Sequence, residues 1–97
     1  MRRAARTDAN HRSIVDGLRK CGYSVLDLSG VGHGCPDILV GYAGLNWLME
    51  IKDGGKPPSA RKLTGPEQAF FDLWKGNVTV VCDLDQALEV MKDKSNA

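Results

Sequence analysis

The stretch Cys35-Pro-Asp-Ile-Leu-Val-Gly-Tyr-Ala-Gly-Leu-Asn-Trp-Leu-Met-Glu-Ile-Lys52 predicts a β-hairpin. An apolar run at 38–40 forms its first arm, and side chains alternate in character along the second arm. A two-residue turn at Ala43-Gly44 would place Asp37 directly opposite Glu50, on one face of the sheet. Lys52 follows two residues later and shares that face. The hairpin is therefore expected to gather two carboxylates and one ammonium group.

These three charged groups predict a site for a divalent cation. Carboxylates that face each other across two strands repel, and a cation between them relieves the repulsion. Two carboxylates, with backbone carbonyls and waters, are ligands that a hard cation such as Mg²⁺ accepts. Pro-Asp and Glu-x-Lys also occur often by chance, so a plain strand entry after Pro36 and a solvated strand edge are the alternative.

The length and composition indicate one soluble domain over 1–97. The chain has 97 residues, 42% of them hydrophobic and 26% charged, which is typical of a folded protein with one modest core. No apolar run approaches the roughly 20 residues of a membrane helix, and the N-terminus lacks the pattern of a secretory signal. The three cysteines form no Cys-x-x-Cys pair, so we expect reduced thiols, a cytoplasmic location and no zinc site.

The charge is distributed unevenly along the chain. Residues 1–62 carry ten Lys/Arg against six Asp/Glu, whereas residues 63–97 carry three against six. A basic half that also holds the carboxylate hairpin suits a polyanion such as DNA, and a merely solvated surface is the alternative. We expect DNA contacts from basic side chains and one histidine: Arg6, Arg12, His33, Lys56, Arg61 and Lys62.

The rest of the pattern predicts helices and strands on both sides of the hairpin. A helix is expected at 8–21, a short strand at 23–28, a helix at 64–75, a strand at 77–82 and a last helix from Asp83. Thr64 and Glu67 form a capping box, and Asp83 with Gln86 caps the last helix. The strand at 77–82 is so apolar that we expect it inside the sheet. The expected buried stripes are Ile14, Val15, Leu18 and Cys21, then Phe70, Leu73 and Trp74, then Leu84, Ala87, Leu88 and Met91.

Two loops and two termini complete the chain. The glycine-rich loop at 29–34 allows close backbone approach, either to a phosphodiester or as a plain connection. The basic loop at 53–65 is long enough to be functional, with simple mobility as the alternative. Residues 1–6 are expected to be a flexible basic arm and residues 92–97 a frayed tail. The element order predicts an α/β fold, a small mixed β-sheet flanked by helices on both faces.

The motif set resembles the PD-(D/E)XK nuclease superfamily. The resemblance lies in Pro36-Asp37, then Glu50-Ile51-Lys52 at a spacing of 13 from Asp to Glu, with Gln68 opening the next helix. It is closer still to the virus-type replication–repair (VRR-NUC) branch, in particular its small stand-alone phage and bacterial members. It covers roughly 8–90 and implies a restriction-endonuclease-like αβββαβ core.

The resemblance also implies roles for individual residues. Asp37 and Glu50 would bind the metal, together with the backbone carbonyl of Ile51. Lys52 would be the charged partner of the attacking water, and Gln68 would help to orient the site. Many relatives carry a glutamate on the first helix. Here the candidate first-helix contributors are Asn10 and His11, with Ser13 also in range and Asp16 the nearest acid.

The resulting hypothesis is a Mg²⁺-dependent, structure-selective DNA endonuclease, with Mn²⁺ as a substitute metal. The resemblance implies branched DNA such as four-way (Holliday) junctions, a role in DNA repair and a bacterial or phage-infected cell. A two-fold junction needs two active sites, so we expect a homodimer. Trp47 or Trp74 could form its interface, although both suit the core. A non-catalytic DNA-binding module with this fold and a protein-interaction domain are the alternatives.

Overall fold

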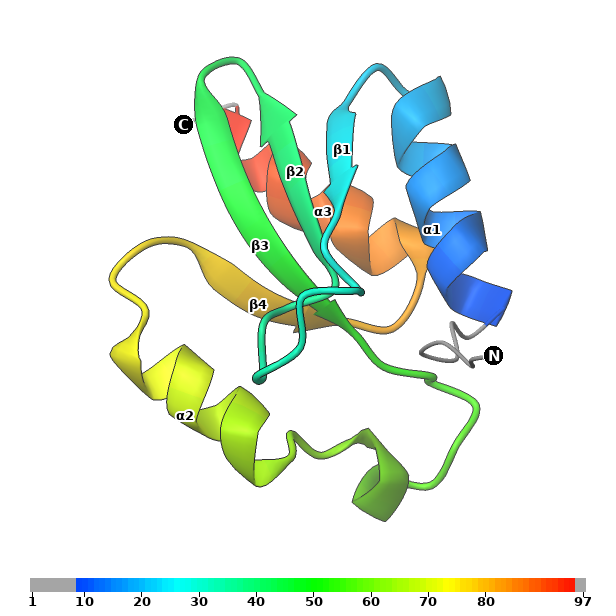
Figure 1. Ribbon diagram of the computed structural model, residues 1–97. Coiled ribbons are helices and arrows are strands. Elements are labelled where there is room, and N and C mark those ends of the chain that lie inside the picture. The colour runs from blue at the N-terminus through cyan, green and yellow to red at the C-terminus, as the bar shows by residue number, and fades with distance from the viewer. Residues whose placement is uncertain (1–8, 96–97) are drawn as a thin grey trace.

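The computed structural model describes residues 9–95, which form a four-stranded sheet and three α-helices (Figure 1). The arm predicted at 1–6, with Arg6, lies outside the described residues. The elements follow in the order α1 (Ala9–Lys20), β1 (Ser24–Asp27), β2 (Ile38–Tyr42), β3 (Leu45–Ile51), η1 (Pro58–Arg61), α2 (Gly65–Leu73), β4 (Val78–Val81) and α3 (Leu84–Ser95). The predicted α/β fold with a small mixed sheet is confirmed.

The hairpin has the predicted register. Tyr42 pairs with Leu45 and Ile38 pairs with Met49, so β2 and β3 are antiparallel around a two-residue turn. The turn residues Ala43 and Gly44 have φ angles of 52° and 82°. Two positive φ angles define the turn type that matches the right-handed twist of paired strands, which locks the register. Continued by one residue, this register brings the position of Asp37 opposite Glu50.

The sheet order is β1-β2-β3-β4, with β4 parallel to β3 and the other pairs antiparallel. The crossover from β3 to β4 runs through η1 and α2, as a parallel connection requires. The expectation that the strand at 77–82 lies inside the sheet is therefore wrong. Val81 faces α3 and is buried, whereas Val80 points to the opposite face, and the outer backbone edge of β4 pairs with no strand among the described residues. An apolar strand sequence indicates that the side chains of the strand are buried. It does not indicate whether the strand lies at the edge or in the interior of the sheet.

One face of the sheet carries the core. α1 and α3 pack together against this face, and α2 stands apart from both, near β4 (Figure 1). The side chains that β2 and β3 direct toward α1 and α3 alternate with those directed away. Glu50 belongs to the second set, so the charged side chains lie on the face opposite α1 and α3. The buried core consists of Ile14, Val15, Leu18, Ile38, Val40, Met49, Ile51, Val81, Ala87 and Met91.

Several expectations about packing are corrected by the structure. Cys21 is exposed because α1 ends at Lys20, one residue before it. Leu73 and Trp74 are 75% and 45% exposed, because α2 lies at the margin of the sheet instead of over its centre. Of the tail predicted to fray at 92–97, the residues up to Ser95 belong to α3, and 96–97 lie outside the described residues. The basic loop contains the short 3-10 helix η1.

Candidate functional site

Asp37 and Glu50 meet where the hairpin opens toward the glycine-rich loop. Asp37 directly precedes β2, and its Oδ2 accepts a hydrogen bond of 2.7 Å from the N–H of Ile51. The N–H of Ile51 points to the side of β3 on which β2 lies, but β2 does not extend this far. The Asp37 carboxylate therefore accepts the hydrogen bond that a backbone carbonyl of β2 would otherwise accept. N–H and C=O of one strand residue point to the same side, so the Ile51 carbonyl also faces Asp37. Glu50 is only 5% exposed, and its Oε1 has no hydrogen-bond partner among the described residues.

Lys52 joins this pair, and its closest partner is a carboxylate that the sequence interpretation assigned only to capping. Lys52 Nζ lies 2.7 Å from Glu67 Oε1 and 3.6 Å from Glu50 Oε2. Glu67 is also the third residue of the predicted capping box, which is confirmed: its Oε1 accepts from the N–H of Thr64, and Thr64 Oγ1 accepts from the N–H of Glu67. One carboxylate therefore both caps α2 and orients the lysine.

The glycine-rich loop explains how α2 reaches the hairpin. Gly34 has a φ of 80°, and a Cβ at this position would lie 2.3 Å from the carbonyl oxygen of Pro66. Only glycine allows the loop to pass so close to the first turn of α2. The close approach that the glycines predicted is therefore made to the helix that carries Glu67, within the protein itself.

The four groups shift one another's protonation. Burial, followed by the charges of Asp37 and Glu67, raises the pKa of Glu50 to about 9. Burial also raises the pKa of Asp37, partly offset by its bond from Ile51. Burial works to lower the pKa of Lys52, but its contacts with Glu67 and Glu50 outweigh this and raise it. Burial would likewise raise the pKa of Glu67, yet Lys52 and Thr64 hold it below its ordinary value. Lys52 is thus a stable cation beside a pair of carboxyls that disfavour full ionisation.

The donor set at Asp37 and Glu50 fits a hard divalent cation. Two carboxyl groups, a buried oxygen of Glu50 without a partner and a nearby backbone carbonyl are oxygen ligands of the kind that Mg²⁺ accepts. Burial is the largest cause of their raised pKa values, and a bound cation would favour their ionised forms. Within residues 9–95, however, no three His, Cys, Asp or Glu side chains are arranged to hold a metal together. The site offers the carboxylates of Asp37 and Glu50 to a cation. The third nearby carboxylate, that of Glu67, is paired with Lys52.

Gln68 is not brought to this cluster. Its side chain is exposed and its Nε2 donates to Asp72 Oδ1 at 2.9 Å, one turn along α2. A helix turns about 100° per residue, so neighbouring positions cannot face the same point. Glu67 therefore occupies the place that the resemblance gave to Gln68. The signal that could have found it is the capping box itself, which puts a carboxylate on the loop-facing first turn.

This placement predicts different results for two adjacent substitutions. In the nuclease that the sequence resemblance implies, Glu67→Gln should lower the cleavage rate, because a neutral amide holds the Lys52 ammonium less firmly than a carboxylate does. A loss of roughly tenfold or more is expected, within the range of a charge-assisted hydrogen bond. Gln68→Ala should change the rate little. Both variants are compared by Mg²⁺-dependent cleavage of the same DNA, and a larger loss for Gln68→Ala would contradict the assignment.

Asn10 and His11 reach the ends of the strands from α1. Asn10 Nδ2 donates to the carbonyls of Lys52 and Cys82, at 3.0 and 3.1 Å, so it joins the ends of β3 and β4. His11 is 6% exposed, and its Nε2 lies 3.2 Å from Asp27 Oδ2 in β1. It also acts to lower the pKa of Asp37, against the larger effect of burial. Both residues position strands, and Asn10 fixes the backbone of Lys52 in particular.

The two bonds from Asn10 predict that an acid at this position is harmful. Asn10→Asp replaces a double donor by an acceptor that faces two carbonyl oxygens. We expect the free energy of unfolding to fall by about 1–3 kcal/mol, the cost of leaving buried polar groups unpaired. Urea denaturation measures the change, with the exposed substitution Ser13→Ala as a control. An Asp variant as stable as the wild type would contradict this role.

The side chains proposed to contact DNA lie mainly on loops. His33, Lys56 and Lys62 are exposed, and Arg12 is exposed on α1. Arg61 ends η1 and is half-buried, with its Nε lacking a hydrogen-bond partner among the described residues. Lys56, Arg61 and Lys62 belong to the segment that leads directly from Lys52 to Glu67. They therefore flank the charged cluster along the chain.

The cysteines and the helices add two further facts. Cys21, Cys35 and Cys82 are free thiols, and burial together with Asp37 and Glu50 raises the pKa of the Cys35 thiol. Among the described residues, none of the helices combines the length and apolar character needed to span a bilayer.

In comparisons with known proteins, neither a family model, nor a curated protein, nor a solved structure matches this chain.

Proposed function

We propose that this protein is a Mg²⁺-dependent endonuclease that hydrolyses phosphodiester bonds in DNA. The observation that carries the proposal is the pair of half-buried Asp37 and buried Glu50 beside the ammonium of Lys52, on the sheet face opposite α1 and α3. The sequence resemblance to VRR-NUC nucleases rests on the same residues. The protein would then have the restriction-endonuclease-like αβββαβ core that the resemblance implies.

The residues would divide the work as follows. Asp37, Glu50 and the Ile51 carbonyl would hold Mg²⁺, which supplies Lewis-acid chemistry at a phosphodiester, and Mn²⁺ should substitute. Lys52 places a positive charge where negative charge develops in the transition state. Because its pKa is raised, Lys52 keeps its proton at neutral pH and acts by electrostatics instead of proton abstraction. Glu67 holds this ammonium in place, so the charge needs little reorganisation during the reaction.

DNA binding would rest on the backbone of the nucleic acid. The proposed contacts come from Arg12, His33, Lys56, Arg61 and Lys62, together with Arg6 in the basic arm. Contacts of this kind read phosphates and shape, so we propose selectivity for structured DNA such as four-way junctions. Such binding should weaken steeply with salt. The compartment that suits a DNA-repair nuclease with reduced thiols is the cytoplasm of a bacterial or phage-infected cell.

A homodimer would supply the two active sites that a symmetric junction requires. Leu73 and Trp74 at the end of α2 are the exposed apolar side chains on which we base this proposal, and Trp74 stacks on Phe70 with ring centroids 5.2 Å apart. Sedimentation equilibrium of the wild type and of Leu73→Lys tests it. A monomeric wild type would count against junction resolution.

A non-catalytic DNA-binding module is the second candidate. Among the described residues, no third metal-ligating side chain joins Asp37 and Glu50, which favours this candidate. The hydrogen bond from Gln68 to Asp72, away from the site, favours it as well. The two proposals are separated by incubating linear, nicked, flap and four-way DNA with the protein, with Mg²⁺ or with EDTA. Cleavage that requires Mg²⁺ supports the nuclease. Salt-sensitive binding of the same DNA without any cleavage, in Mg²⁺ or Mn²⁺, would support the module.

A further inference from the structure

The outer edge of β4 presents backbone groups that pair with no other strand. The N–H of Leu48 donates to the carbonyl of Asn77 at 3.0 Å, which fixes the phase of the parallel ladder. Alternate residues of a strand direct their N–H and C=O to the same side. Val78 and Val80 therefore direct theirs away from β3. Among the described residues, no other strand pairs with the outward N–H and C=O groups of Val78 and Val80.

One end of this edge is already satisfied by a side chain. Cys82 is the next outward-facing position, and its N–H donates to Gln86 Oε1 at 2.7 Å. Gln86 stands in the first turn of α3, where its own N–H donates to Asp83 Oδ1. The Gln86 amide thus takes the part that the carbonyl of a neighbouring strand would play. The positions of Val78 and Val80 have no such substitute.

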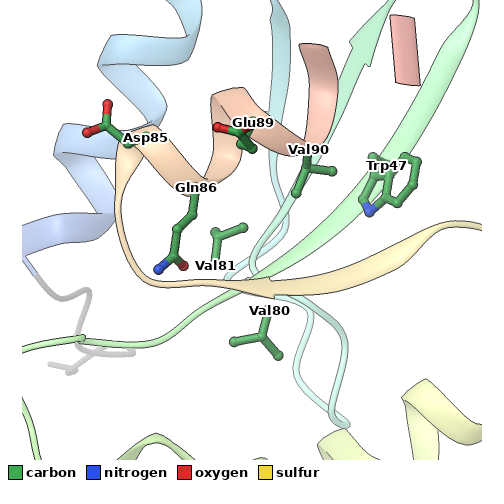
Figure 2. Close-up of a pocket in the computed structure, with 7 residues that line it drawn as sticks. All are labelled: Trp47, Val80, Val81, Asp85, Gln86, Glu89 and Val90. Atoms are coloured by element: carbon green, nitrogen blue, oxygen red, sulfur yellow. The ribbon is translucent and has the colours of Figure 1, made fainter. Parts of the chain in front are cut away.

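A groove of about 470 Å³ runs beside this edge, between β4 and α3 (Figure 2). Its walls are mostly apolar, and its polar residues come from α3, where Asp85 and Glu89 stand one turn apart. Trp47 and Val81 point from the sheet toward the α3 side, whereas Val80, which pairs with Glu50, points to the opposite face (Figure 2). The groove is lined by Trp47, Val80, Val81, Asp85, Gln86, Glu89 and Val90.

The charge of the rim decides which partner suits the groove. In a two-fold dimer formed through β4, the same edge would face itself, and Asp85 and Glu89 of both copies would be brought together. Like charges at a contact are unfavourable, so self-pairing is disfavoured. A segment with basic side chains would instead gain charge complementarity. The acidic excess of residues 63–97 acts in the same direction.

We propose that the β4 edge and its groove bind an extended, basic and apolar peptide segment of another protein by strand addition. The backbone of that segment would pair with Val78 and Val80, one apolar side chain would enter the groove, and a Lys or Arg would lie against Asp85 and Glu89. The bound segment leaves the face that carries Asp37 and Glu50 open. The interaction is therefore independent of the proposed nuclease function, and either proposal can fail without the other.

The test is an NMR titration of the ¹⁵N-labelled full chain with the acetylated and amidated peptide Lys-Thr-Val-Thr-Lys-Thr-Val, in which Lys and Val lie on the same face of an extended strand. Binding should slow amide hydrogen exchange at Val78 and Val80. The matching peptide with Glu in place of Lys should bind at least about tenfold more weakly. The double variant Asp85→Lys with Glu89→Lys should invert that preference, whereas Asp16→Lys on α1 should leave it unchanged.

A backbone variant tests the strand pairing separately. Val78→Pro removes one outward donor, and proline is tolerated as the first residue of an edge strand. It should weaken binding of the Lys-containing peptide, with folding checked by thermal unfolding. If that variant does not fold, the charge-inverted variant still decides. No binding, equal binding of both peptides, or protection away from β4 would overturn the proposal. So would a dimer of the wild type that Val78→Pro dissociates, because the occupant would then be a second copy.

Discussion

Glu50→Gln is expected to abolish Mg²⁺-dependent cleavage and, at the same time, to stabilise the metal-free protein. Loss of one of the two carboxylates proposed to bind the metal should reduce the rate by at least about 10²–10³, the scale of a lost preorganised electrostatic contact. Cleavage of a four-way junction measures this, with the exposed Asp16→Asn as the control. A variant that cuts at the wild-type rate would contradict the assignment of Glu50.

The stability effect follows from the pKa of Glu50, which burial raises from an ordinary value of 4.5 to about 9 in the folded protein. A raised carboxyl pKa means that the folded state holds a proton that the unfolded state releases above about pH 4.5. The contribution of Glu50 to stability is therefore greatest at low pH and falls as the pH rises toward 9. In EDTA, Glu50→Gln should exceed the wild type by about 1–3 kcal/mol at pH 8 and by much less at pH 5. Urea denaturation at both values measures the difference, and an equally stable variant at pH 8 would contradict the burial effect.

Lys52→Met is expected to lose about 10²–10³ in cleavage rate while keeping the metal site. Methionine preserves the length and packing of the side chain but removes the charge that Glu67 and Glu50 hold in place. Single-turnover cleavage rates compare it with Lys20→Met, an exposed substitution on α1. The pH dependence is informative as well. If Lys52 acts as a fixed cation, the wild-type rate should not rise with deprotonation of an amine near neutral pH.

Loss of Mn²⁺ binding in Lys52→Met would indicate that the lysine builds the metal site instead of serving the transition state. An unchanged cleavage rate would remove Lys52 from the mechanism altogether. Both results are distinct from the expected pattern of intact metal binding with slow chemistry.

The hairpin was predictable because a two-residue turn fixes the register of everything beyond it. Once Ala43 and Gly44 are placed in the turn, the alternation of β3 determines that Glu50 and Lys52 share a face. The capping residues Thr64 and Asp83 were equally accessible, because their hydrogen bonds are local. These elements share one property: the residues that define them are close in sequence.

The contacts that could not be predicted join segments far apart in the chain. Glu67 meets Lys52 only because Gly34 lets the loop lie against α2, and no local pattern reveals that approach. The edge position of β4 depends on which strand pairs last, which its apolar sequence does not encode. The exposure of Leu73 and Trp74 has the same origin, since amphipathic spacing marks a face without saying what covers it.

The central claim is that Asp37 and Glu50 form one binding site for a divalent cation. Isothermal titration of the wild type with Mn²⁺, against the double variant Asp37→Asn with Glu50→Gln, tests it most directly. The account predicts saturable binding by the wild type and none by the double variant, with both proteins folded. Equal binding by the two proteins, or no binding by a folded wild type, would contradict it.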